Sequence, residues 1–206
     1  MNNKKIIYLI LILVYCFFFS CEKDSVTDKP GFVLDSIDNI SAEEYKIYSL
    51  VIDEYFTSSE IVIKQKTNSF SSIEKYNFVY YHLIDNNELL DSTLINNYIK
   101  INDSTYYFDN KFSCDSKKII LITDDEIDYY FGNIDINEAW GNFYIDYPNS
   151  AGIISFTRIG FNKTHTEALL ETGITYASLG GFGNIVYLEK KNNNWIIVDK
   201  FGTWVS

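Results

Sequence analysis

The chain has few of the residues that build metal, redox and disulfide chemistry. Its 206 residues include three cysteines, two histidines, one methionine and two prolines. Neither His-Glu-x-x-His nor Cys-x-x-Cys occurs, so we expect no metal site. His165 and Glu167 have the His-x-Glu spacing of zinc deaminases, but those enzymes also need a downstream cysteine pair that this sequence lacks. We therefore expect no metal and no cofactor, and we interpret His82 and His165 as surface or capping residues.

Signals of other common active sites are missing as well. There is no Gly-x-Ser-x-Gly nucleophile motif. The formal charge of −11 repels phosphate backbones, which argues against nucleic-acid binding. The densest acidic run, Asp124 to Asp128, lacks the alternating ligands and central glycine of a calcium loop and suits the first turn of a helix instead. The sequence carries no positive evidence for catalysis.

The N-terminal segment, by contrast, has a clear pattern. Two lysines precede an uncharged run of 14 residues, Ile6 to Phe19, which is too short to cross a bilayer as a helix. This pattern predicts a secretory signal peptide over residues 1–20. The run leads into Phe18-Phe19-Ser20-Cys21, which resembles the lipobox of bacterial lipoproteins of the Bacteroidota type. The resemblance implies palmitate on Cys21 and a mature protein anchored to the outer membrane, facing the periplasm or the cell surface.

The mature chain is expected to fold as one domain behind a linker. Residues 21–39 are polar and contain Pro30-Gly31, which predicts a flexible tether followed by a single domain over residues 40–206. Without the signal, 15 basic and 28 acidic residues give a formal charge of −13, so lipid is the only evident membrane contact. Cys114 has no partner for an intramolecular disulfide, and we expect it to be an apolar filler in a monomeric domain.

Hydrophobic periodicity predicts helices first and strands later. Helices are expected at about residues 42–56, 92–101, 124–131 and 137–147. The first has a capping box of Ser41 and Glu44, and the third one of Thr123 and Glu126. Short strands are expected at 60–66 and 118–122, and residues 67–91 are ambiguous between helix and strand.

From residue 152 onward, polar and apolar residues alternate with the period of strands. The expected strands cover residues 152–161, 165–173, 184–191 and 195–205. The prediction is an α+β domain in which N-terminal helices pack on a C-terminal antiparallel sheet, a four-strand meander.

Four short motifs between residues 45 and 206 resemble an uncharacterised family of bacterial envelope proteins. They are Tyr48-Ser49, Tyr147-Pro148, Arg158 to Asn162, and Trp204 to Ser206. The resemblance implies one domain that many envelope proteins share, and it brings no activity with it.

Arg158 is a candidate ligand-binding residue because it is the only arginine beside sixteen lysines. In a strand it would share a face with Ile154 and Phe156, where its charge needs a partner. Arginine suits planar, bidentate contacts. Two interpretations stay open. The simpler one is a structural pair with one of three acids, Glu138, Glu167 or Glu171, and the other is a role in holding an anionic ligand.

Gly180, Gly181 and Gly183 are further candidates. They lie between two expected strands, whereas a phosphate cradle needs a following helix and a lysine. A flexible hairpin loop is the simpler interpretation. The alternative is the lip of a small ligand site, since glycine permits close backbone approach.

The leading functional hypothesis is a lipid-anchored envelope protein that acts as a non-enzymatic binding or interaction module. One alternative is a small hydrolase, or a pocket-bearing ligand-binding domain with a nuclear-transport-factor-like cone fold. Another is glycan binding through exposed tyrosine or tryptophan. A deep polar pocket with a perturbed carboxylate would favour the hydrolase or cone fold, and a filled aromatic core would favour the module.

Overall fold

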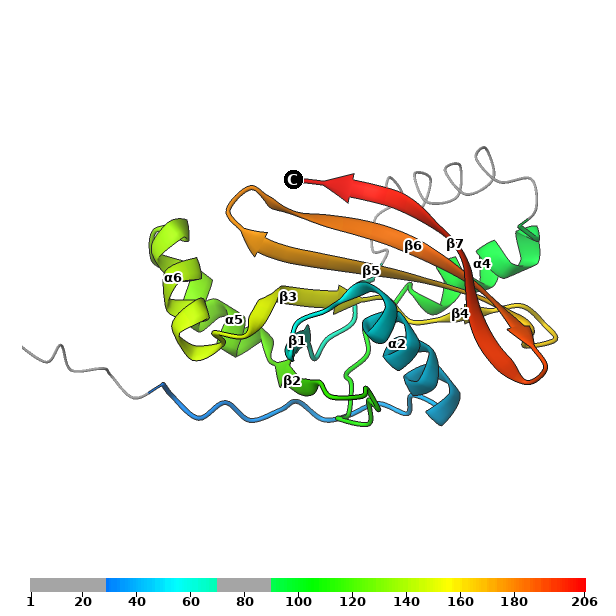
Figure 1. Cartoon of the computed structure of the whole chain (residues 1–206), viewed down its shortest axis with the longest axis horizontal. Coiled ribbons are helices and arrows are strands. Elements are labelled where there is room, and N and C mark those ends of the chain that lie inside the picture. Colours follow the sequence, from blue (N-terminus) through cyan, green and yellow to red (C-terminus); the bar gives the residue numbers. More distant parts are fainter. Residues whose placement is uncertain (1–28, 70–89) are drawn as a thin grey trace, which may run out of the picture. The chain divides into compact units, whose positions relative to one another are not determined.

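One mixed β-sheet organises the part of the chain that the computed structural model describes, residues 29–69 and 90–206 (Figure 1). The chain divides into two units, Met1–Gly31 and Phe32–Ser206, and the elements below belong to the second. The strands are β1 (Glu60–Lys64), β2 (Lys118–Ile122), β3 (Ser150–Phe156), β4 (Gly160–Phe161), β5 (Glu167–Ala177), β6 (Gly180–Lys191) and β7 (Asn194–Val205). The helices in the described ranges are α2 (Ala42–Tyr55), α4 (Ser92–Ile101), α5 (Asp124–Phe131) and α6 (Ile136–Asp146). The signal peptide, the lipobox, His82 and most of the ambiguous segment 67–91 lie outside the described residues.

The sheet is larger than the sequence predicts. Its order is β2-β1-β3-β5-β6-β7, and β4 also pairs with β5. The run β3-β5-β6-β7 is antiparallel and corresponds to the predicted meander. β1 pairs in parallel with both β2 and β3, so the sheet is mixed. The α+β class is confirmed, whereas a sheet limited to a four-strand meander is wrong.

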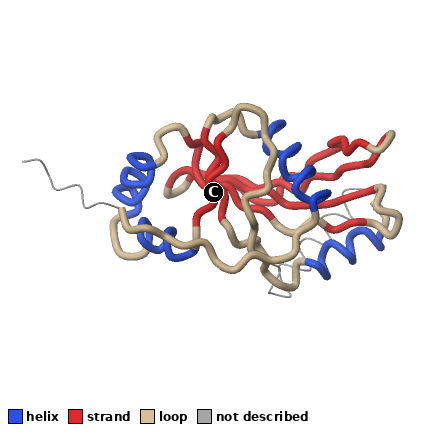
Figure 2. Tube along the Cα trace, turned by 90° about the horizontal axis from the view of Figure 1, so that it is seen from below, coloured by secondary structure: helices blue, strands red, loops and turns tan. Residues whose placement is uncertain are grey.

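The helices are not confined to the N-terminal part either. α4 lies in the chain between β1 and β2, and α5 and α6 lie between β2 and β3. Neighbouring parallel strands need a long connection, and the described part of the connection from β1 to β2 contains α4. Figure 2 shows helices on both sides of the strands.

Alternation along the strands assigns the helices to the two faces. Ile154 of β3 belongs to a core cluster with α2, whereas its neighbour Ile153 belongs to a cluster with α5 and α6. Ile153 lies opposite Thr175 of β5. Leu169, six residues before Thr175, is on the same face of β5 and packs against α4. One face therefore carries α2, and the other carries α4 at one end and α5–α6 at the other.

The α2 face holds a filled aromatic core. Tyr48, Phe108 and Phe156 are fully buried, with ring centroids of Tyr48 5.1 Å from those of both phenylalanines. The Tyr48 hydroxyl donates to the Thr157 carbonyl at 2.9 Å, so the polar atom at the end of the ring is satisfied.

Local capping signals set the helix starts. At α2 the Ser41 side chain accepts from the Glu44 amide while Glu44 accepts from the Ser41 amide, which confirms the predicted capping box. At α5 Thr123 accepts from the Glu126 amide at 3.1 Å, which is one of the two hydrogen bonds of the predicted capping box. The Glu126 carboxylate also accepts a hydrogen bond from the hydroxyl of Tyr147, the C-cap residue of α6.

Residues 32–39, within the segment predicted as a tether, contact the domain. The Asp35 amide donates to the side chain of Gln65 at 2.8 Å, and the Asp38 amide donates to the Tyr107 carbonyl at 3.0 Å. Phe32 packs on Tyr129 of α5 with ring centroids 5.6 Å apart.

Candidate functional site

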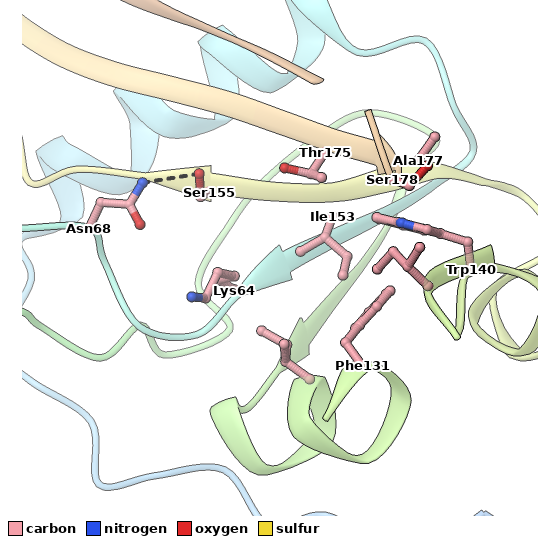
Figure 3. A pocket seen from close by; sticks show the side chains of 11 residues that line it. Lys64, Asn68, Phe131, Trp140, Ile153, Ser155, Thr175, Ala177 and Ser178 are labelled. Carbon is pink, nitrogen blue, oxygen red and sulfur yellow. Dashed lines mark hydrogen bonds between the residues drawn. The ribbon is translucent and has the colours of Figure 1, made fainter. Parts of the chain in front are cut away.

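A pocket of about 420 Å³ lies between α5, α6 and the sheet (Figure 3). Its volume falls in the range of sites for small molecules. Eleven residues from five segments line it: Lys64, Asn68, Ile127, Phe131, Ile136, Trp140, Ile153, Ser155, Thr175, Ala177 and Ser178.

The helical wall of the pocket is apolar and well supported. Phe131 of α5 and Trp140 of α6 meet edge to face, with ring centroids 4.8 Å apart. Two hydrogen bonds tie the helices together, from the Tyr130 hydroxyl to Asp146 and from the Tyr147 hydroxyl to Glu126. Burial raises the pKa of both phenols, so they remain protonated donors. The aromatic wall is thus held in one position.

The sheet side of the pocket carries polar groups around Ile153. Ser155 lies two residues further along β3, and Thr175 lies opposite Ile153 on β5. The Asn68 amide group donates to the Ser155 hydroxyl oxygen at 3.1 Å, the contact drawn in Figure 3. Asn68 itself is held because its backbone amide donates to the Phe156 carbonyl at 2.8 Å.

Positive charge gathers at one end of the pocket. Lys64 Nζ lies 3.6 Å from one carboxylate oxygen of Asp124, and Lys66 Nζ lies 2.8 Å from the other. Burial by itself would raise the pKa of Asp124, but the hydrogen bond from Lys66 and the charge of Lys64 outweigh it and hold that pKa below its ordinary value. Two ammonium groups therefore share one ionised carboxylate.

Lys64 is the one titratable side chain in the described pocket lining. None of the other described lining residues is an aspartate, glutamate, histidine or cysteine. A hydroxyl nucleophile needs a base, and the Lys64 amine, the basic group of the lining, pairs with Asp124. The lining thus offers hydroxyl and amide hydrogen-bonding groups and one ammonium group.

Arg158 lies away from this pocket, in the short connection from β3 to β4. Its Nε and Nη2 donate to the two carboxylate oxygens of Glu44 at 2.8 and 3.1 Å, and its guanidinium lies 4.2 Å from the centre of the Tyr106 ring. Its side chain is 9% exposed. The prediction of a paired, bidentate arginine is confirmed.

The partners that the sequence suggested for Arg158 are wrong. Arg158 lies beyond the end of β3 and faces the start of α2, so it meets Glu44 rather than the acids considered. Glu171 instead accepts from Thr203, Glu167 accepts from Tyr187, and Glu138 lies exposed in the first turn of α6. A ligand role for Arg158 stays a prediction.

The predicted glycines lie in β6 itself rather than in a loop. A Cβ on Gly183 would lie 2.0 Å from Nε1 of Trp204, and one on Gly181 2.9 Å from the same ring. The glycines therefore make room for the Trp204 indole, which lies over them. Gly180 begins the strand beside Tyr176. Gly183 also lines a separate hollow of about 500 Å³ with Lys200 and Trp204, so the proposed lip of a ligand site stays a prediction.

None of the candidate site residues that the sequence suggests lines the pocket. Lys64 and Ser155 each follow directly after an apolar run, Ile61–Ile63 in β1 and Ile153–Ile154 in β3, and that change was the available signal. It does not reveal that these two strands are neighbours, because β1 and β3 are about ninety residues apart in the chain.

Cysteine and the side chains that bind metals are the other reactive types among the described residues. Burial raises the pKa of the Cys114 thiol, the opposite of what a reactive cysteine needs. Within residues 29–69 and 90–206, no three histidine, cysteine or acidic side chains are grouped to hold a metal ion. No helix in these ranges has the length and apolarity that a membrane span requires. No family model, curated protein or solved structure matches the chain.

Proposed function

We propose that this is a lipid-anchored protein of the cell envelope whose domain binds a small amphipathic molecule without transforming it. The observation that supports binding is the pocket, with a fixed aromatic wall on one side and polar groups at its sheet side. The aromatic core around Tyr48 is filled, so a ligand would bind at a surface pocket such as this one rather than inside that core.

The hydrolase alternative finds less support at the same site. Ser155, Ser178 and Thr175 supply hydroxyls, but Lys64, the one basic side chain in the described lining, is paired with Asp124. The fold class alone does not favour a cone-shaped domain over other α+β arrangements.

Binding can be tested with a fluorescent apolar probe on the mature chain, residues 21–206. N-phenyl-1-naphthylamine should gain fluorescence on entering the pocket, and Thr175→Trp should abolish the gain, because the new indole occupies the space beside Ile153. Val198→Trp is the matched control, since Val198 is an exposed residue on β7 that does not line the pocket. Equal probe binding by both variants would contradict the proposal.

The envelope assignment rests on the lipobox resemblance and on the resemblance of residues 45–206 to envelope proteins. Cys21→Ala should abolish labelling by a palmitate analogue in cells and should leave the precursor uncleaved. Ser20→Ala is a suitable control, because it keeps a small residue before the cysteine. Label retained by the Cys21→Ala protein would rule out lipidation at this position.

A further inference from the structure

We infer that the pocket selects molecules with one negative charge at the end of an apolar body, and that Lys64 is the charged contact. This inference rests on the proposed binding function and adds the chemical class of the ligand.

The first argument is the local charge. Lys64 and Lys66 both approach Asp124, but Lys66 is at hydrogen-bond distance, 2.8 Å, and Lys64 is at 3.6 Å. Lys66 also lies 5.9 Å from the centre of the Tyr107 ring, which holds it on its own side. Asp124 is the only acid that the described residues place within 4 Å of Lys64. The group therefore has a net charge of about +1, and Lys64 has the weaker partner.

The second argument is where Lys64 lies. It is the last residue of β1 and shares a face with Val62, which packs in the α5–α6 cluster. Its side chain is 31% exposed, so its ammonium group is open to a ligand yet partly shielded from solvent. Figure 3 shows it at the end of the pocket away from Trp140, with Ser155 and Asn68 nearby.

The third argument is the separation of polar and apolar lining. Ser155 accepts from Asn68, so its own hydroxyl hydrogen is available to an anion at the Lys64 end. Phe131 and Trp140 form the opposite, apolar end. A protein with a formal charge of −11 repels anions at long range, so an anion that binds at this end of the pocket needs a local cation such as Lys64.

Two probes with the same aromatic body test the inference. 8-Anilino-1-naphthalenesulfonate carries one sulfonate, and N-phenyl-1-naphthylamine is the same molecule without it. In the mature chain, Lys64→Met should weaken binding of the sulfonate about fivefold, the loss expected for one partly exposed ion pair, and should leave the neutral probe unchanged. Lys191→Met is the control. This substitution removes the same charge at the exposed end of β6 and should change the binding of neither probe.

A second measurement needs no variant. Raising the salt concentration from 0.05 to 0.5 M should weaken binding of the sulfonate and leave the neutral probe unaffected. If Lys64→Met and salt leave sulfonate binding unchanged while Thr175→Trp still blocks the neutral probe, the inference is overturned and the proposed function stands. If Thr175→Trp blocks neither probe, both fail.

Discussion

Glu44 has two roles at the start of α2. One carboxylate oxygen accepts from the Ser41 backbone amide at 3.0 Å and closes the capping box, while the other accepts from Arg158 Nε at 2.8 Å. The backbone of Arg158 is held as well, since its amide donates to Asn102 Oδ1 at 2.7 Å and its carbonyl accepts from Asn102 Nδ2 at 2.9 Å. Asn102 is the C-cap residue of α4. Arg158 thus joins helices from both faces to the connection between β3 and β4.

Replacing Arg158 should therefore cost stability even when the charge is kept. Arg158→Lys should lower the free energy of unfolding by about 1–3 kcal/mol, because lysine cannot make the two parallel hydrogen bonds or stack on Tyr106. Arg158→Met should cost more, about 3–5 kcal/mol, because it leaves the Glu44 carboxylate buried without a cation. Urea unfolding measures both values.

The control for these variants is Lys111→Met. Lys111 pairs with Asp109 at the surface with its side chain 61% exposed, and its loss should change the free energy of unfolding by less than about 0.5 kcal/mol. An Arg158→Met protein that unfolds at the same urea concentration as Lys111→Met would show that the buried pair contributes nothing.

At the scale of elements, the sequence predicts helices better than strands. The predicted helix 42–56 matches α2, and 92–101 and 124–131 match α4 and α5, because side chains that cap each helix lie within three residues of its start. The predicted strand 118–122 also matches β2. Local information is sufficient where the deciding contacts are local.

The strands near the glycines show where local information fails. The predicted strands stop at 173 and restart at 184, whereas β5 reaches Ala177 and β6 begins at Gly180. Glycine favours loops in isolation, but here Gly181 and Gly183 pair in the sheet because Trp204, about twenty residues later, packs over them. A tertiary contact overrides the local preference.

The pocket is a stronger case of the same limitation. Phe131 and Trp140 of its wall lie in two helices that the sequence predicts, 124–131 and 137–147. Its polar side depends on β1 lying beside β3, a parallel pairing that no short-range pattern specifies. The helices that carry the wall were therefore predictable, whereas the pairing that completes the pocket was not.

At the scale of the whole molecule, the folded unit begins before the first helix. Gln65 is fully buried, and its side chain accepts from the Asp35 amide at 2.8 Å and donates to the Asp35 carbonyl at 3.0 Å. Asp38 exchanges hydrogen bonds with Tyr107 through its backbone amide and its carboxylate. Residues 32–39 thus satisfy polar groups of the domain that would otherwise lose their partners.

A chain that starts at residue 40 should accordingly be less stable than one that starts at residue 32. We expect the free energy of unfolding to fall by about 1–3 kcal/mol, because removal of Asp35 leaves the Gln65 side chain without two of its hydrogen bonds.

Substituting Gln65→Met separates this cause from a general loss of contacts. The substitution should destabilise the longer chain, where it strands the Asp35 backbone, and should cost much less in the shorter chain, where that partner is already gone. Urea unfolding of the four proteins gives the coupling, and equal stability of the two parent chains would show that residues 32–39 are only a linker.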